Sequence, residues 1–88
     1  MVDFYYAYYQ RQTLNKNGEW EDKLYDHQLI VVVASNYDEA KYKIFNCLDK
    51  MKDYRYRAVL SSDIKEAAGI DFIYDFRGDL CISPIEEN

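Results

Sequence analysis

The chain has 88 residues, of which 49% are hydrophobic and 31% charged, and its formal net charge is −5 at neutral pH. This balance is typical of a folded globular protein rather than a disordered one, and the length suits one small core. The negative charge argues against a general nucleic-acid binder, because neutralising phosphates requires a basic surface. No stretch approaches the ~20 apolar residues of a membrane span. We predict a single α+β domain over residues 1–88, with a short acidic tail at residues 84–88 and no membrane association.

Alternating side chains predict a first strand over Val2–Gln12. Its even-numbered apolar residues are expected to face the core, which leaves Tyr5 and Tyr9 on a partly solvated face; the core set is Val2, Phe4, Tyr6 and Tyr8. Asn15-Lys16-Asn17-Gly18 is a strong turn sequence, because Asn and Gly tolerate positive φ. The chain is therefore expected to return through residues 19–23 as the second strand of a hairpin.

The unbroken apolar run Leu29–Ala34 predicts a buried central strand, which begins near Leu24. A helix is expected directly after it. Asn36 and Glu39 have the spacing of a capping box at its start, and the helix ends by residues 52–53. Its apolar residues recur at helical spacing and are predicted to face the sheet: Ala40, Ile44, Leu48 and Met51.

Alternation predicts a third strand over Tyr54–Ser61, and a capping sequence followed by Gly69 predicts a short helix over Asp63–Ala68. Two further strands, Asp71–Phe76 and Asp79–Ser83, are expected to form a second hairpin whose tip is Arg77-Gly78. The predicted order is β-β-α-β-short α-β-β. This order indicates a mostly antiparallel sheet packed on one main helix.

Residues able to carry out chemistry are few and scattered. His27 is the only histidine, and Cys47 and Cys81 are the only cysteines, without a CxxC pair. No metal-ligand set, glycine-rich phosphate loop or nucleophile elbow can be assembled. We predict no catalytic residues, no metal and no cofactor, and a protein that is not an enzyme. The cysteine pattern indicates buried, reduced thiols and, with no secretion signal at the N-terminus, a cytoplasmic protein.

Aromatic residues beside acidic ones are the feature that points to a function. We predict a partner-binding surface formed by Tyr5, Tyr9, Glu19, Trp20, Glu21, Asp22 and Tyr25. Tyr and Trp are enriched in binding hot spots, and the acids would steer the surface toward a larger protein with a basic surface. A competing interpretation is that tyrosines fill the core of a chain with few leucines.

The predicted function is a small non-catalytic protein-interaction module that inhibits or regulates a larger protein, for example a nucleic-acid-processing one. The small size and the acidic-aromatic hairpin carry this prediction. Phage-type anti-defence inhibitors, such as anti-CRISPR proteins, are analogous in size and acidity, although no motif matches.

A basic stretch with interleaved aromatic residues carries the alternative function, nucleic-acid or nucleotide binding; its residues are Lys50, Lys52, Tyr54, Arg55, Tyr56 and Arg57. Strand alternation separates its tyrosines from its arginines, so a core-facing tyrosine pair with solvated arginines is the competing structural interpretation. A third prediction is a homo-oligomeric structural protein in which Val2–Gln12 pairs with the same strand of a second copy.

Overall fold

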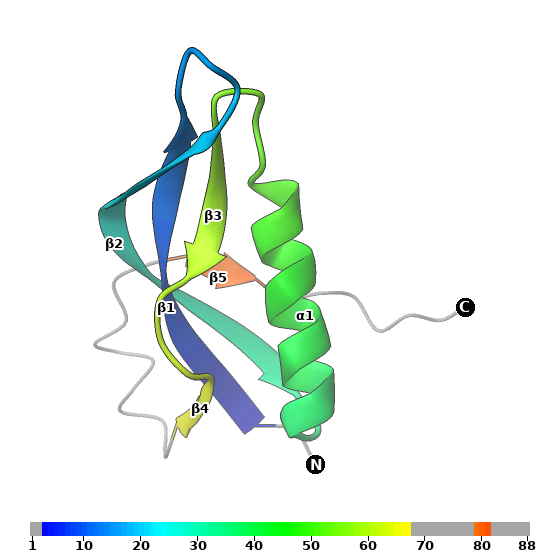
Figure 1. The fold of residues 1–88 in the computed structure, drawn as a ribbon. Coiled ribbons are helices and arrows are strands. Elements are labelled where there is room, and N and C mark those ends of the chain that lie inside the picture. The colour runs from blue at the N-terminus through cyan, green and yellow to red at the C-terminus, as the bar shows by residue number, and fades with distance from the viewer. Residues whose placement is uncertain (1–2, 68–78, 82–88) are drawn as a thin grey trace.

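The structure is a computed structural model that describes residues 3–67 and 79–81. In chain order the elements are β1 (Asp3–Leu14), β2 (Trp20–Ala34), α1 (Tyr37–Lys50), β3 (Tyr56–Leu60), β4 (Lys65–Ala67) and β5 (Asp79–Cys81). The described strands form one sheet in the order β3-β1-β2-β5, and β4 pairs with β1 beside β3. α1 lies against one face of this sheet (Figure 1), which confirms the predicted small α+β fold.

The β1–β2 hairpin is the largest unit of the fold. Its turn has the predicted geometry, because Gly18 has φ +82° and its N–H donates to the Asn15 carbonyl at 3.0 Å. The Asn15 side-chain oxygen accepts from the N–H groups of Asn17 and Glu19 at 2.8 and 3.0 Å. β1 continues two residues beyond its predicted end, to Leu14, and the returning segment runs on into the apolar run as one continuous strand, β2, as expected.

The prediction of the core face of β1 is wrong. Tyr5, Ala7 and Tyr9 are buried, at 7%, 0% and 8% exposure, whereas Tyr8 is 38% exposed and stacks on His27 with ring centres 4.8 Å apart. The register explains this, because Tyr5 lies opposite Val32 and Ala7 opposite Ile30 in antiparallel β2. Those two β2 residues face α1, and cross-strand partners share a face of the sheet.

The predicted start of α1 at Asn36 is confirmed, and so is the burial of Ala40, Ile44 and Leu48, whereas Met51 is half-buried at the C-cap. The Asn36 side chain accepts from the Glu39 N–H at 2.9 Å, and the Glu39 carboxylate accepts from the Ser35 N–H at 2.7 Å. This backbone hydrogen bond is the main cause that lowers the pKa of Glu39. The Lys43 Nζ lies 3.4 Å from the Glu39 Oε2 and donates to the Val33 carbonyl at 2.7 Å. These contacts connect the first turns of α1 to β2. The buried face is Ala40, Ile44, Cys47 and Leu48.

The second half of the chain differs from prediction in one element. The short helix over Asp63–Ala68 is wrong for its described residues, because Lys65–Ala67 forms β4 and pairs antiparallel with Phe4–Tyr6 of β1. β1 supplies hydrogen-bond partners for β4 from far along the chain, and these outweigh local helix preference. Because β2 covers one side of β1 and β3 and β4 cover the other, the predicted pairing of Val2–Gln12 with the same strand of a second copy is wrong. The third strand is confirmed within its predicted range, as Tyr56–Leu60.

The predicted last strand is found in part, as Asp79–Cys81, and pairs parallel with Ile30–Val32 of β2. The rest of the predicted second hairpin and the acidic tail lie outside the described residues; these parts are Asp71–Phe76, the tip Arg77-Gly78, residues 82–83 and residues 84–88.

The cysteine prediction requires a correction. Cys47 is buried on α1 and is disulfide-bonded, so it is not the reduced thiol that the sequence pattern indicated. The only other cysteine of the chain, Cys81, belongs to β5, and β5 contacts both β2 and α1. The sequence spacing of the two cysteines says nothing of this proximity, because it arises from strand pairing. Within residues 3–67 and 79–81, no helix is long and apolar enough to cross a membrane.

Candidate functional site

A groove lies at the turn end of the β1–β2 hairpin, and we call it the hairpin groove. Its volume is about 530 Å³, and its lining residues are Asn15, Glu19, Trp20, Glu21, Asp22, Lys23 and Tyr25. Five residues of the predicted partner-binding surface are among them: Glu19, Trp20, Glu21, Asp22 and Tyr25. The chain from Glu19 to Tyr25 therefore gathers most of the predicted surface in one place.

A network across three strands holds the tryptophan of the groove. The guanidinium carbon of Arg57, on β3, lies 4.3 Å from the centre of the Trp20 ring. The Arg57 Nε donates to the Gln12 Oε1 at 2.9 Å, and the Gln12 Nε2 donates to the Glu21 carbonyl at 2.7 Å. The Trp20 ring is thus fixed by a cation–π contact whose cation is itself held in place by β1.

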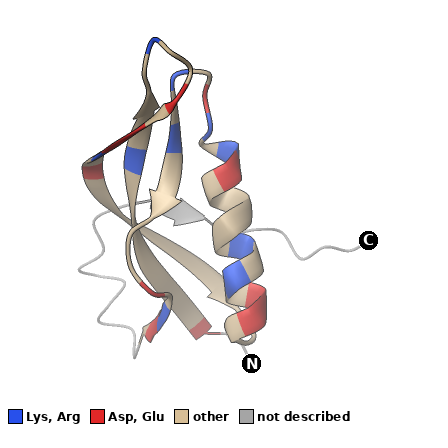
Figure 2. Ribbon diagram, viewed as in Figure 1, with Lys and Arg blue, Asp and Glu red and all other residues tan. Residues whose placement is uncertain are grey.

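The charges of the groove are predominantly negative. It is lined by three carboxylates and one ammonium group, and the Lys23 Nζ lies 4.9 Å from the centre of the Tyr25 ring. Glu19 and Asp22 are exposed, whereas the half-buried Glu21 accepts from the Thr13 hydroxyl at 2.7 Å. Figure 2 shows acidic residues along the first part of β2 and basic residues on β1 and β3. Glu19 and Asp22 are therefore the carboxylates available to a partner.

Two residues that were predicted for the partner-binding surface do not lie in the hairpin groove. Tyr5 and Tyr9 are buried on the helix-facing side of β1 and line no part of the hairpin groove. They were predicted to be exposed because the wrong face of β1 was assigned to the core. The register with β2 places them on the face that α1 covers. The interpretation in which tyrosines fill the core is confirmed for these two positions.

The basic stretch does not form one surface. Tyr54 is 78% exposed and has the Arg55 guanidinium carbon 4.9 Å from its ring centre. Tyr56 is half-buried and is contacted in the same way by Arg11, at 5.0 Å. Arg57 belongs to the Trp20 network on the other face of the sheet, whereas Lys50 and Lys52 are exposed at the end of α1. The interpretation in which Tyr54 and Tyr56 both face the core is therefore wrong for Tyr54.

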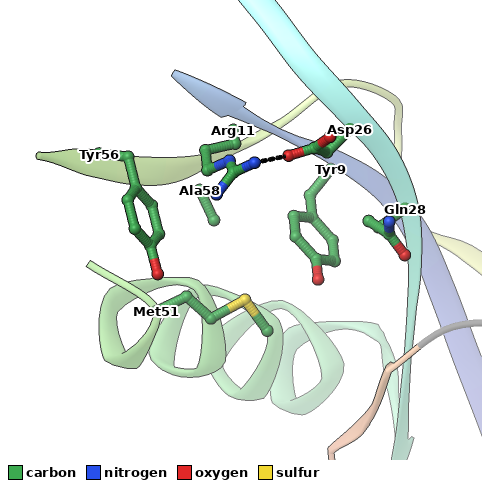
Figure 3. Close-up of a pocket in the computed structure, with 7 residues that line it drawn as sticks. All are labelled: Tyr9, Arg11, Asp26, Gln28, Met51, Tyr56 and Ala58. Atoms are coloured by element: carbon green, nitrogen blue, oxygen red, sulfur yellow. Dashed lines mark ion pairs between the residues drawn. The ribbon is translucent and has the colours of Figure 1, made fainter. Parts of the chain in front are cut away.

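A second cavity, which sequence reasoning missed, lies between the end of α1 and the sheet (Figure 3). We call it the helix-end pocket. Its volume is about 470 Å³, and it is lined by Tyr9, Arg11, Asp26, Gln28, Met51, Tyr56 and Ala58. Arg11 and Asp26 form an ion pair inside it. No pattern in the sequence marks this pocket, because its residues come from four separate segments.

A pair of carboxyl groups lies at the opposite end of β1. The protonated carboxyl of Glu66, on β4, donates a hydrogen bond to the Asp3 carboxylate, and this bond together with charge repulsion from Asp3 raises the pKa of Glu66. Burial, with the charges of Glu66 and Asp3, raises the pKa of the Tyr5 hydroxyl. The described residues contain no group of three or more His, Cys, Asp or Glu side chains that could hold a metal ion.

Comparison with protein-family models, with curated proteins and with solved structures found no match for this chain. The two cavities are therefore interpreted from their own geometry and charge.

Proposed function

We propose that this protein is a non-catalytic interaction module that inhibits or regulates a larger protein, and that the hairpin groove is the contact surface. The observation that carries the proposal is the fixed Trp20 ring beside the exposed carboxylates of Glu19 and Asp22. Trp is among the residues most enriched in binding hot spots. Because Arg57 and Gln12 already hold the surroundings of this ring in place, binding would lose little side-chain entropy.

The charge of the groove selects the partner. Three carboxylates against one ammonium favour a basic surface, since complementary potentials raise the rate of encounter. Proteins that process nucleic acids carry such surfaces to bind phosphates. A phage-type anti-defence inhibitor, of which anti-CRISPR proteins are an example, would use this charge to occupy the nucleic-acid site of its target.

The test is affinity capture from a nuclease-treated bacterial lysate with three forms of the protein. The first is the wild type, the second carries Glu19→Lys and Asp22→Lys, and the third carries Asp49→Lys and Asp63→Lys. Both double variants change the net charge equally, and all four substituted residues are exposed. Glu21 is left intact because its carboxylate bonds to Thr13 across the hairpin.

We expect one target protein to bind the wild type and the control variant, and to be lost from the groove variant. With that target purified, the groove variant should associate about 10-fold more slowly at low salt and show a flatter salt dependence. Equal capture by all three forms, or equal association rates, would contradict the proposal.

The proposed location is the cytoplasm, where the targets of an anti-defence inhibitor act. The disulfide at Cys47 is the observation opposed to it, because cytosolic thiols are kept reduced. Rapid alkylation of intact expressing cells, followed by mass spectrometry of the protein, distinguishes the two. An alkylated Cys47 supports the cytoplasm, and an oxidised Cys47 places the protein in an oxidising compartment.

A specific observation favours a second candidate, the binding of single-stranded nucleic acid. Tyr54 is 78% exposed and carries Arg55 beside its ring, which is the pairing of aromatic face and cation that stacks and neutralises nucleotides. Tyr54→Ala should weaken binding of a fluorescent single-stranded oligonucleotide about 5- to 100-fold. Tyr42→Ala, at a tyrosine that is 69% exposed on α1, is the matched control. An oligonucleotide that fails to bind the wild type at low salt excludes this candidate.

A further inference from the structure

The helix-end pocket shares no lining residue with the hairpin groove and lies on the face of the sheet that α1 covers. Its volume of about 470 Å³ falls within the range of small-molecule sites, ~300–1,000 Å³. Figure 3 shows the Tyr9 and Tyr56 rings extending from the sheet toward the helix, on either side of Arg11 and Ala58, with Met51 opposite. The pocket is therefore a space with aromatic side walls and an apolar floor.

An irregularity of the hairpin builds the polar side of the pocket. The β1–β2 register shifts between Tyr9 and Arg11, so that Tyr9 pairs with Gln28 and Arg11 with Tyr25. Asp26 lies within this shift and has φ 58°, a left-handed conformation that is uncommon outside glycine. Bulges of this kind redirect side chains and are found beside functional sites. Here the bulge brings both Asp26 and Gln28 to the pocket.

Arg11 and Asp26 present adjacent donors and acceptors. Their ion pair joins one guanidinium nitrogen to one carboxylate oxygen, and both side chains are about half exposed, at 45% and 44%. A guanidinium has five N–H donors and a carboxylate about four acceptor positions, so the pair can bind a ligand without separating. The Gln28 amide adds one donor group and one acceptor beside them.

The aromatic walls offer ring faces on which a flat ligand can stack. Tyr56 lies opposite Thr13 of β1, four residues from Tyr9, which is a separation of about 13 Å along the strand. Proteins bind unpaired bases by contact with aromatic rings or arginine planes and by hydrogen bonds to the base edge. The Arg11 guanidinium carbon lies 5.0 Å from the centre of the Tyr56 ring, which leaves the Tyr9 ring for stacking and the Arg11 N–H groups for the edge of the base.

We propose that the helix-end pocket binds a purine nucleotide and that guanine is its preferred base. The guanine edge carries the O6 acceptor beside the N1–H and N2–H donors, which complements the guanidinium of Arg11 beside the carboxylate of Asp26. Adenine presents an unprotonated N1 at the corresponding position, and this lone pair would face a carboxylate. The preference therefore follows from the order of donors and acceptors. This binding site is additional to the proposed protein-interaction function and independent of it.

The test compares guanosine, adenosine and cytidine monophosphates by calorimetry on the full chain. The three share their phosphate, so differences in affinity report on the base. We expect guanosine monophosphate to bind at least about 10-fold more tightly than either of the others, which is the size of discrimination expected from one good paired contact to a base. In nuclear magnetic resonance spectra, it should shift the Arg11 Nε–H and Gln28 side-chain amide signals.

Asp26→Asn removes the acceptor while keeping a residue that tolerates the left-handed conformation. It should lower guanosine monophosphate affinity about 10-fold and remove the preference over adenosine monophosphate. Asp63→Asn is the matched control, because it makes the same charge change at an exposed residue that lines neither cavity. Unchanged affinity in Asp26→Asn, equal affinities of the three nucleotides for the wild type, or no binding at millimolar concentration overturns the proposal. The wild-type resonance shifts test it even if Asp26→Asn fails to fold.

Discussion

Replacing Ile44 by alanine is expected to remove a large part of the stability of this protein. Ile44 is fully buried between α1 and the sheet, at 0% exposure. Its side chain loses three carbon atoms in the substitution, worth about 0.8 kcal/mol each in transfer free energy, and the cavity left behind adds to this. The expected loss is therefore about 3 kcal/mol, from a total of roughly 4–13 kcal/mol for a chain of this length.

The assay is thermal and urea unfolding followed by circular dichroism. A loss of about 3 kcal/mol lowers the Tm of a domain of this size by roughly 12–24 °C. Phe45→Ala is the matched control, because the neighbouring residue points away from the core and is 45% exposed; it should change stability by no more than about 1 kcal/mol. If Ile44→Ala lowers the Tm no more than Phe45→Ala does, α1 does not pack on the sheet through its predicted apolar face, and the reasoning fails.

Three further predictions concern single contacts. Asn36→Ala removes the helix cap and should lower stability by about 1 kcal/mol in urea unfolding, whereas Asn36→Asp should retain it. Gly18→Ala meets no atom within 4 Å, so any loss, expected at about 1 kcal/mol, reports backbone strain at φ +82° alone; no loss would mean that this turn relaxes to another conformation. Glu66→Gln should raise the Tm at pH 7, because Asp3 raises the pKa of Glu66. The stabilising protonated form is fully present below the ordinary pKa of 4.5 and is lost as pH rises through the raised value, so the advantage of glutamine should vanish toward pH 4.

Local features could be predicted because their causes lie within a few residues. The turn at residues 15–18 depends on a glycine that adopts positive φ and on an asparagine that bonds to its own backbone. The start of α1 depends on the spacing of Asn36 and Glu39: the Asn36 side chain accepts from the Glu39 N–H, and the Glu39 carboxylate reaches back to the N–H of Ser35, one residue before the cap. The apolar spacing of α1 identified its buried face for the same reason.

The face of β1 could not be predicted from its own residues. Both faces carry tyrosines, and a strand of period two has no internal signal that separates them. The register with β2 determines which face of β1 is buried, because it places Tyr5 and Ala7 opposite Val32 and Ile30, which pack against α1. The same register buries Tyr5 and Tyr9, so neither residue can contribute to the predicted partner-binding surface.

The candidate sites divide in the same way. The sequence by itself determined that Glu19, Trp20 and Asp22 gather at one end of a hairpin, because neighbours on a strand stay together. Only the tertiary structure decided that Arg57 holds Trp20, and that the left-handed Asp26 meets Arg11 in a pocket. It likewise turned Lys65–Ala67 into a strand. These contacts join residues distant in the chain, and their free energy depends on strand register and bulges that only the folded sheet establishes.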